Sequence, residues 1–288
     1  MFHFREDHLT GVEVRKSIIK EGYSIREVYF ESPYKRYVKA FLIVPKQTSS
    51  HPAVIFMHPG QENRKSFYKE AQLLAEKGFV SLIIESPFLV GCQQEGKHYK
   101  KFIQTIEPLV DIQNYTQMIM DIRRGITLLS KLEFVDANRM AYVGHGFGAT
   151  WGGVLAGIEN RIKAFVLIAG ASQTSSWHMT SEHPMAVLIR SFLPPERFDF
   201  FISNLRKFDA THYIKNAAPA SIYFQFAKND EYGDCDQATS FYTAASSPKK
   251  ISWYQTDHGF SQCEEAFLDR HNWLLDKIGL PNDILVTE

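Results

Sequence analysis

The stretch Arg139–Gly157 constrains the fold of this chain more than any other part of the sequence. It reads RMAYVGHGFGATWGGVLAG: a short apolar run, Met140–Val143, leads into a Gly-x-x-x-Gly cluster and then into small residues. Short apolar runs are typical of strands buried in a parallel sheet. The small residues that follow favour a helix that begins at once. The sequence therefore predicts a strand, a sharp turn and a helix, with Gly146 at the centre of the turn.

The glycine cluster Gly144-His145-Gly146-Phe147-Gly148 is similar to the nucleophile elbow of α/β-hydrolases, whose pattern is G-x-S-x-G. Both flanking glycines are present, but Gly146 stands at the position of the serine. The nucleophile of an elbow is held in a strained backbone conformation, which costs on the order of 1–3 kcal/mol. Glycine largely avoids that cost. The sequence thus predicts the turn that carries a nucleophile, without the side chain that would react.

The rest of the chain alternates apolar strands with amphipathic helices, which predicts a mainly parallel sheet with helices on both faces. A short helix is expected within residues 1–22, followed by an antiparallel hairpin of Ser24–Glu31 and Arg36–Val44. The expected buried strands are Ala53–Met57, Phe79–Ile84, Ile162–Ala169, Ala220–Ala227 and Ile251–Gln255. The expected helices are Lys65–Lys77, Asp111–Leu132, Cys235–Ala245 and Phe260–Ile278, with a long loop over Glu85–Pro108.

One insertion, at about residues 171–218, is too long for a simple connection. We expect it to form a small helical cap on a single domain that spans residues 1–288. Ligands in such sheets bind at the carboxyl ends of the strands, where this insertion begins. Its aromatic side chains are therefore candidates for substrate binding, namely Trp177, Phe192, Phe200 and Phe201. The alternative is that they only attach the cap to the body.

Two polar groups follow strands late in the chain, Asp230 after Ala220–Ala227 and His258 after Ile251–Gln255. The order nucleophile, acid, histidine is the one that α/β-hydrolases use. Histidine can accept and return a proton near neutral pH, and a carboxylate fixes its tautomer. We expect Asp230 and His258 to form the acid–base pair. Glu231 and Asp234 are alternative acids that better suit solvated turns.

The segment His58-Pro59-Gly60-Gln61, after the first buried strand, is expected to help form an oxyanion hole. One backbone donor should be Phe147, directly after the nucleophile position, and the other should come from this segment. Pro59 has no N–H, so the second donor must be Gly60 or Gln61, and we favour Gln61. The alternative for Gly60 is that it only permits a tight turn. His58 and His145 also lie near the expected pocket. Local hydrogen bonding or packing explains both better than a metal site, for which the spacing gives no support.

The composition limits the classes of function. The 32 basic and 32 acidic side chains give a formal charge of zero, which argues against nucleic acid or a membrane surface as the main partner. The three cysteines lack metal-site spacing and cannot all pair. The first ten residues lack the apolar segment of a signal peptide, and the sequence has no apolar segment long enough to span a membrane. We expect a cytoplasmic protein, and the sequence is compatible with a homodimer.

Taken together, these motifs resemble α/β-hydrolases of the dienelactone-hydrolase-like and acylaminoacyl-peptidase-like type, over roughly residues 25–278. The resemblance implies ester or amide hydrolysis through an acyl-enzyme, without a cofactor, on a small-molecule ester or related acyl substrate. It makes Asp230 the acid, His258 the base and Gly146 the place of the missing serine.

Three hypotheses follow from the missing serine. The favoured one is a carboxylic-ester hydrolase whose serine was deliberately replaced by glycine, so that the chain is inactive. The second is a natural non-catalytic binding protein that keeps the pocket. The third is an enzyme in which His258 activates water.

Overall fold

A computed structural model describes residues 11–33, 36–46, 50–60, 62–86 and 108–279. Its centre is one nine-stranded sheet with the strand order β1-β2-β3-β5-β4-β6-β7-β8-β9. The strands are β1 (Val12–Ile19), β2 (Tyr23–Glu31), β3 (Tyr37–Pro45), β4 (His51–Met57), β5 (Val80–Ile84), β6 (Val135–His145), β7 (Ile162–Ile168), β8 (Ser221–Asn229) and β9 (Lys249–Asp257).

The sheet has an antiparallel part and a parallel part. The strands β1, β2 and β3 form an antiparallel meander, and β3 pairs antiparallel with β5. From β5 through β4, β6, β7 and β8 to β9 all pairs are parallel. The expected hairpin and the mainly parallel sheet are therefore confirmed. The carboxyl ends of the parallel strands share one edge of the sheet, so the loops that follow β4, β6, β8 and β9 can meet there.

The expectation of a short helix within residues 1–22 was wrong for the part of that range that the structure describes. Val12–Ile19 forms the edge strand β1, and every one of its residues is exposed. Because all of its residues are exposed, this edge strand has no buried stripe. The mixed apolar and charged sequence therefore carries no periodicity that reveals it.

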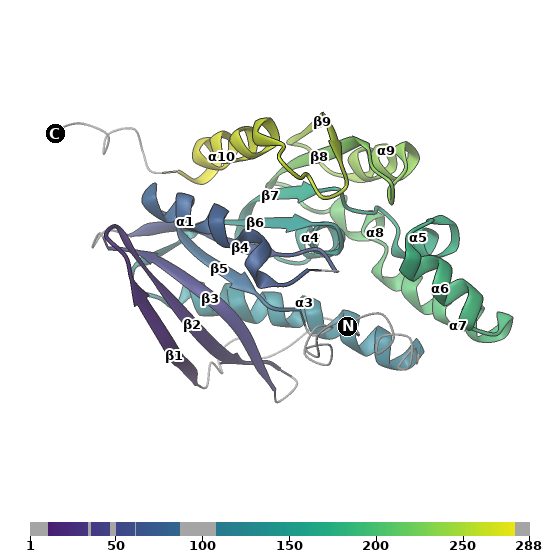
Figure 1. Ribbon diagram of the computed structural model, residues 1–288, viewed down its shortest axis with the longest axis horizontal. Coiled ribbons are helices and arrows are strands. Elements are labelled where there is room, and N and C mark those ends of the chain that lie inside the picture. Colours follow the sequence, from purple (N-terminus) through teal and green to yellow (C-terminus); the bar gives the residue numbers. More distant parts are fainter. Residues whose placement is uncertain (1–10, 34–35, 47–49, 61, 87–107, 280–288) are drawn as a thin grey trace.

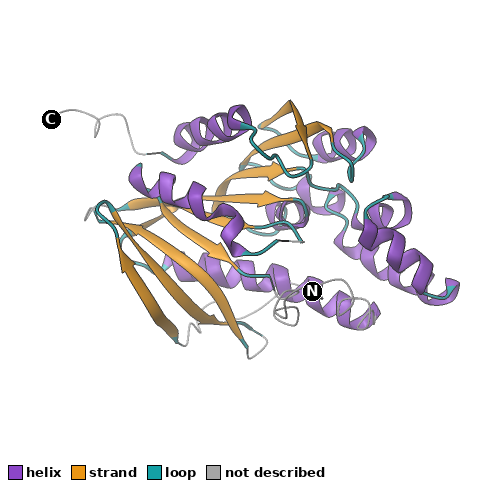
Figure 2. Cartoon of the chain, in the orientation of Figure 1, coloured by secondary structure: helices purple, strands orange, loops and turns teal. Residues whose placement is uncertain are grey.

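Helices cover both faces of the sheet (Figure 2). They are α1 (Tyr68–Glu76), preceded by the 3₁₀ turn η1 (Arg64–Phe67), α3 (Pro108–Ser130), α4 (Phe147–Ala156), α9 (Cys235–Ala244) and α10 (Glu264–Ile278). The apolar sides of α1 and α10 belong to one buried cluster, and those of α3, α4 and α9 to the other. The last helix begins four residues later than expected, because Phe260 and Gln262 have positive φ angles and form a turn. The expected loop over 85–108 falls largely on residues outside the described part.

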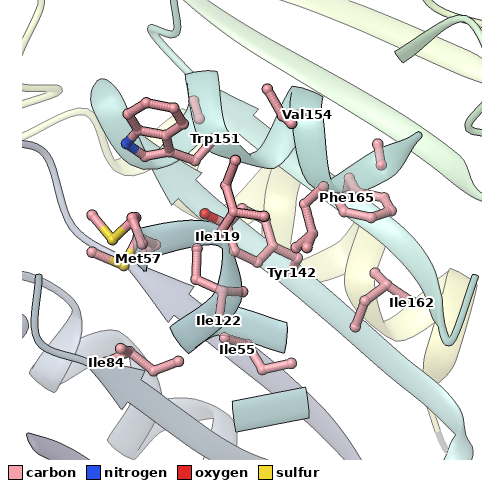
Figure 3. Close-up of a cluster of buried hydrophobic side chains, with 14 of the residues drawn as sticks. Ile55, Met57, Ile84, Ile119, Ile122, Tyr142, Trp151, Val154, Ile162 and Phe165 are labelled. Atoms are coloured by element: carbon pink, nitrogen blue, oxygen red, sulfur yellow. The ribbon is translucent and has the colours of Figure 1, made fainter. Parts of the chain in front are cut away.

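The larger buried cluster joins the elbow helix to the sheet and to α3. Figure 3 shows Trp151 and Val154 of α4 above Tyr142 of β6, with Ile119 and Ile122 of α3 on the near side. All five side chains are fully buried. The helix that starts at the elbow is thereby fixed against the strand that precedes it, so the turn between them has little freedom.

The insertion between β7 and β8 is helical. It contains α5 (Thr174–Thr180), α6 (Pro184–Phe192), α7 (Pro195–Leu205), the 3₁₀ turn η3 (Arg206–Phe208) and α8 (Thr211–Ile214). Figure 1 shows α5, α6 and α7 beyond the end of the sheet to which the arrows of β6 and β7 point. The insertion therefore stands beside the loops that carry the expected site. Among the described residues, no helix is long and apolar enough to cross a membrane.

Candidate active site

The elbow has the backbone that the glycine pattern predicts. The strand β6 ends at His145, α4 begins at Phe147, and Gly146 between them has φ 54° and ψ −117°. Residues with a side chain rarely adopt these backbone angles, whereas glycine adopts them readily. The Gly146 N–H donates to the carbonyl of Ile168 at 2.8 Å, and its own carbonyl accepts from Ala149 and Thr150. These bonds hold the turn between neighbouring strands and the helix.

The space above Gly146 faces the candidate base. A Cβ atom placed on Gly146 would lie 3.4 Å from Nε2 of His258 and 3.2 Å from Cβ of Pro59. The second contact is tight but involves one side-chain atom. A hydroxyl one bond beyond that Cβ would be within hydrogen-bonding reach of the imidazole. The site is thus arranged around a side chain that the sequence does not supply.

Asp230 holds His258 in that orientation. Nδ1 of His258 lies 2.9 Å from each carboxylate oxygen of Asp230, so the Nδ1–H donates to the carboxylate and Nε2 is left facing residue 146. Oδ1 of Asp230 also accepts from the backbone N–H groups of Tyr232 and Gly233. Burial alone raises the pKa of Asp230, but the hydrogen bonds and the His258 charge outweigh it and place the pKa below its ordinary value. The carboxylate is therefore ionised when it orients the imidazole.

The two alternative acids have other partners. Glu231 accepts the backbone N–H of His258 at 3.2 Å and so fixes the loop rather than the ring. Asp234 is the N-cap of α9, where its side chain accepts from Gln237. Of the three acids in this loop, Asp230 is the one that meets the imidazole.

His145, the second residue of the elbow pattern, also supports His258. Its Nε2–H donates to the backbone carbonyl of His258 at 2.7 Å. Burial, assisted by the nearby His258 charge, lowers the pKa of His145 to about 4, so its ring is neutral near pH 7. His145 lines none of the described pockets, so the structure does not place it in contact with a ligand.

The expected oxyanion segment is partly described. Phe147 is the first residue of α4, where backbone N–H groups have no partner within the helix. Gln61, the favoured second donor, lies outside the described residues. His58 is fixed by its neighbours, because its Nδ1–H donates to the Pro59 carbonyl at 2.7 Å and its Nε2 accepts from the Ser86 N–H at 3.1 Å. Burial lowers the pKa of His58 to about 4, so it holds this segment as a neutral ring.

A pocket opens directly above Gly146, and we call it the His258 pocket. Its walls come from the elbow, the loop after β7, the cap and the acid loop. The lining residues are Gly146, Phe147, Thr150, Ala169, Ala171, Thr174, Trp177, His183, Tyr232 and His258. Thr174 is 1% exposed, and its hydroxyl has no hydrogen-bond partner in the described part of the chain. The oxygen of this hydroxyl is itself buried, with less than 1 Å² of accessible surface.

The cap aromatics divide into three environments. Trp177 lines the His258 pocket, as the sequence predicts. Phe192 and Phe200 are 62% and 48% exposed and line none of the described pockets. Phe201 is buried in the core and packs edge-on against His178 at 5.2 Å between centroids. The structure thus brings only one of the four candidates to the His258 pocket. Phe200 and Phe201 are neighbours on α7, and the helical turn directs them to different sides.

His183 and Tyr232 line the pocket but were absent from the sequence-based candidates. Nδ1 of His183 accepts from the Met185 N–H, so His183 caps α6 just before Pro184. Burial, followed by the charge of His258, lowers the pKa of His183 to about 4. Its ring packs on Tyr232 at 4.5 Å, and Tyr232 in turn packs on His258 at 5.2 Å. Proline at the first helical position is a helix-start signal, whereas the place of His183 over the site depends on the tertiary fold.

The described residues contain no group of three or more His, Cys, Asp or Glu side chains placed to hold a metal ion.

The chain matches a known protein family over most of its length. Residues 6–258 match the family model of acetyl xylan esterase (AXE1). The chain belongs to the acetyl xylan esterase family. The superfamily predicted from the elbow and the two turns, and the α/β-hydrolase fold, are thereby confirmed. Membership places the chain in a family of carboxylic-ester hydrolases.

Solved structures agree on the fold. The acetyl xylan esterase from Paenibacillus sp. R4 has a TM-score of 0.77 at 19% identity, covering 94% of this chain and 90% of the other. Acetyl xylan esterase 1 from Thermoanaerobacterium sp. JW/SL YS485 has a TM-score of 0.70 at 18% identity, covering 89% and 86%. The Pyrococcus horikoshii acylaminoacyl peptidase has a TM-score of 0.72 at 17% identity, covering 91% of this chain but 43% of the peptidase. None of the curated proteins matches the sequence.

Proposed function

We propose that this chain carries the binding site and acid–base pair of a serine-type ester hydrolase, and that Gly146 blocks formation of the acyl-enzyme. The chain would then bind esters without turning them over by that route. One observation carries the proposal: Nε2 of His258, oriented by Asp230, lies 3.4 Å from the place of a Cβ at residue 146. We regard residues 1–288 as one unit with the cap at 171–218 closing the pocket.

A serine at position 146 would complete the reaction. Its hydroxyl oxygen would attack the ester carbonyl while Nε2 of His258 takes the hydroxyl proton. The negative charge on the carbonyl oxygen would be stabilised by the Phe147 N–H, and by Gln61 if it donates as expected. The protonated His258 would then return that proton to the departing alcohol, leaving an acyl-serine. Water activated by the same imidazole would release the acid and restore the serine.

The family and the pocket support a small ester as substrate. The two acetyl xylan esterases among the structural relatives suggest acetyl esters of a carbohydrate as the first substrates to test. The rings of Trp177 and Tyr232 line the pocket and offer apolar surfaces on which a sugar could rest.

The direct test is the Gly146→Ser substitution, with Gly146→Ala as the matched control. We expect the serine variant to hydrolyse acetylated xylan or 4-nitrophenyl acetate with an initial burst, because an acyl-enzyme accumulates. The alanine variant should show neither the burst nor the rate. A folded Gly146→Ser protein that stays inert on a broad panel of esters and amides would contradict the proposal, and a binding role would then be preferred.

A second candidate function uses the same empty space. A water between Pro59 and Nε2 of His258 would occupy the place of a serine hydroxyl, and His258 could activate it as a general base. This mechanism predicts hydrolysis by the unsubstituted chain, without a burst, that His258→Gln abolishes. If the unsubstituted chain binds esters and does not cleave them, the water mechanism is excluded.

A further inference from the structure

A second pocket adjoins the His258 pocket on the side of the loop 230–234, and we call it the Gln237 pocket. Its walls come from the ends of β8 and β9, from α9 and from α5, which lie together in Figure 1. The two pockets share five lining residues, namely Ala169, Ala171, Trp177, Tyr232 and His258. The empty space of the Gln237 pocket, its mouth included, is about 690 Å³. A ligand that begins above Gly146 can therefore continue past His258 into this space.

The chemistry of an ester decides which part of it lies in which pocket. The carbonyl carbon must lie above residue 146 and the carbonyl oxygen must face the Phe147 N–H, so both belong to the His258 pocket. The leaving alcohol must face Nε2 of His258, because His258 returns a proton to it. His258 lines both pockets, whereas Gly146 and Phe147 do not line the Gln237 pocket. The Gln237 pocket is therefore on the alcohol side of the ester.

The side chain of Gln237 is held with its amide nitrogen unused. Its Oε1 accepts from the Ser172 hydroxyl at 2.6 Å and from the Gln173 N–H at 3.2 Å. A backbone N–H can only donate, so the amide oxygen must face it and the NH₂ group must point elsewhere. Nε2 has no hydrogen-bond partner in the described part of the chain, and it is not buried. Gln237 thus brings an oriented and accessible donor to the pocket wall.

The other side chains of the pocket are both apolar and polar. Trp253 of β9 lines it beside Phe226, on which it packs at 5.3 Å between ring centroids. Lys228 and Asp234, both exposed, add a donor and an acceptor. Because the wall carries charges of both signs, a neutral ligand suits it better than a charged one. A sugar ring has the matching chemistry, since its C–H groups are apolar and each of its hydroxyls both donates and accepts.

We infer that the Gln237 pocket binds a cyclic polyol, the alcohol part of an acetyl ester whose acetyl group lies in the His258 pocket. The Gln237 amide donates to an oxygen of the polyol, and the ring of Trp253 packs against its C–H groups. Gln237 is thereby a specificity-determining residue, which favours a sugar ester over a cycloalkyl ester of similar size. The place of the acetyl group rests on the proposed function, whereas binding of the polyol does not.

The experiment measures binding to the unsubstituted Gly146 chain by ¹⁵N–¹H NMR, so it does not depend on catalysis. The probes are ethyl acetate, cyclohexyl acetate and methyl 2-O-acetyl-β-xylopyranoside. Their alcohols have no ring, a ring without hydroxyls and a ring with hydroxyls. We expect cyclohexyl acetate to bind about tenfold more tightly than ethyl acetate, because more apolar carbon is buried. The xyloside should bind about fivefold more tightly than cyclohexyl acetate, because it adds hydrogen bonds.

Two side-chain signals report where the ring lies. The NH₂ signals missing from Gln237→Glu identify Gln237, and the indole signal missing from Trp253→Leu identifies Trp253. The xyloside should shift both, whereas cyclohexyl acetate should shift that of Trp253 alone. Gln72 of α1 provides a control NH₂ signal that should not move, since its Nε2 donates to the Tyr68 carbonyl within α1.

A matched pair of substitutions tests the role of Gln237. Gln237→Glu keeps an oxygen that accepts from Gln173 and removes the NH₂ donor, so the xyloside should lose its advantage over cyclohexyl acetate. Gln255→Glu adds the same charge at an exposed position of β9 that lines none of the described pockets, so the advantage should remain. Trp253→Leu should bring the affinities of both ring esters close to that of ethyl acetate.

Three results would overturn the inference. The first is a xyloside that binds the unsubstituted chain no more tightly than cyclohexyl acetate does. The second is an unmoved Gln237 NH₂ signal when the xyloside is bound, and this result decides the point if a variant does not fold. The third is an advantage of the xyloside that Gln237→Glu retains or that Gln255→Glu loses as well. Binding as expected together with an inert Gly146→Ser variant would refute the proposed hydrolase activity and leave the polyol site standing.

Discussion

His145 donates from Nε2 to the backbone carbonyl of His258 across 2.7 Å, so the elbow and the histidine loop are joined by a side chain of the elbow itself. This hydrogen bond connects the residue next to Gly146 directly to the backbone of His258, and so fixes the distance between residue 146 and the imidazole. Since His145 is neutral and buried, the bond does not depend on pH near 7. The histidine next to the vacated position is a positioning residue, because it acts on the site through His258.

Replacing His145 should impair turnover more than binding. In a Gly146→Ser background, we expect His145→Phe to lower kcat by up to about 100-fold with little change in KM, because a displacement of about 1 Å can cost that much. His145→Gln, whose amide can donate from a similar place, should recover most of the rate. Steady-state kinetics on 4-nitrophenyl acetate measure both parameters. Equal kcat in His145→Phe and its parent would show that the bond does not position His258.

The aromatic residues of the cap should separate in a matched alanine series. Phe201→Ala should lower the free energy of unfolding by about 3–5 kcal/mol, because a fully buried ring is lost. Phe192→Ala and Phe200→Ala should change it by less than about 0.5 kcal/mol, since both rings are largely exposed. Trp177→Ala should weaken ester binding most. Urea unfolding and ligand titration of the four variants test this, and a binding loss in Phe192→Ala or Phe200→Ala would restore these residues to the site.

The sequence predicts an element well when the residues that give its local pattern are also the ones that fix its place in the fold. The run Met140–Val143 is apolar because it is a central strand, and Asp230 and His258 follow strands because polar groups collect at the carboxyl edge. Both signals are local. Trp177 lies at the His258 pocket, where its role in binding remains a prediction. Phe200 and Phe201 are adjacent in sequence, and the sequence alone does not show which of the two faces the core.

The features that the sequence did not predict depend on contacts between distant segments. His183 is a helix cap by its local sequence and becomes part of the pocket wall only because α6 packs beside Tyr232. His145 resembles any packing histidine until its carbonyl partner, 113 residues away, is in place. The edge strand β1 has no buried face, so hydrophobic periodicity could not reveal it.

A buried ion pair away from the site should control stability in acid. Glu70 of α1 accepts two hydrogen bonds from Arg270 of α10, at 2.8 and 2.6 Å. Burial alone raises the pKa of Glu70, but the Arg270 charge and hydrogen bonds, with help from His271, lower it to about 2 from 4.5. Because the folded-state pKa lies below the unfolded one, this stabilisation is complete above about pH 4.5 and is lost as the pH falls towards 2.

The loss over that window should be on the order of 3 kcal/mol. Glu70→Gln should make the free energy of unfolding less dependent on pH in this window. It should also destabilise the protein at pH 7 by about 3–5 kcal/mol, because Arg270 is left buried and unpaired. Glu76→Gln, at an exposed position on the same helix, should keep the parent's pH profile. Urea unfolding between pH 7 and pH 3 measures all three proteins. A parent profile that stays flat from pH 5 to pH 3 would show that the ion pair does not act in this way.

At Gly146, activity and stability should move in opposite directions. Any side chain there must adopt φ 54° and ψ −117°, and its Cβ must pass 3.2 Å from Pro59. Gly146→Ser and Gly146→Ala should therefore both lower the free energy of unfolding by on the order of 1–3 kcal/mol. Only the serine variant should gain turnover, since only it places a hydroxyl beside Nε2 of His258. The comparison separates the backbone cost from the chemistry, and urea unfolding beside burst kinetics measures each.

The alanine variant decides between two accounts of the glycine. If Gly146→Ala is as stable as the parent, the elbow imposes no strain, and relief of strain does not explain why glycine suits this position. If both variants lose stability equally while serine alone gains several orders of magnitude in rate, the strain is the cost of holding a nucleophile in the elbow. Triad enzymes that lack a member retain only about 10³–10⁴-fold catalysis over water, so the serine should restore far more activity than the glycine site shows.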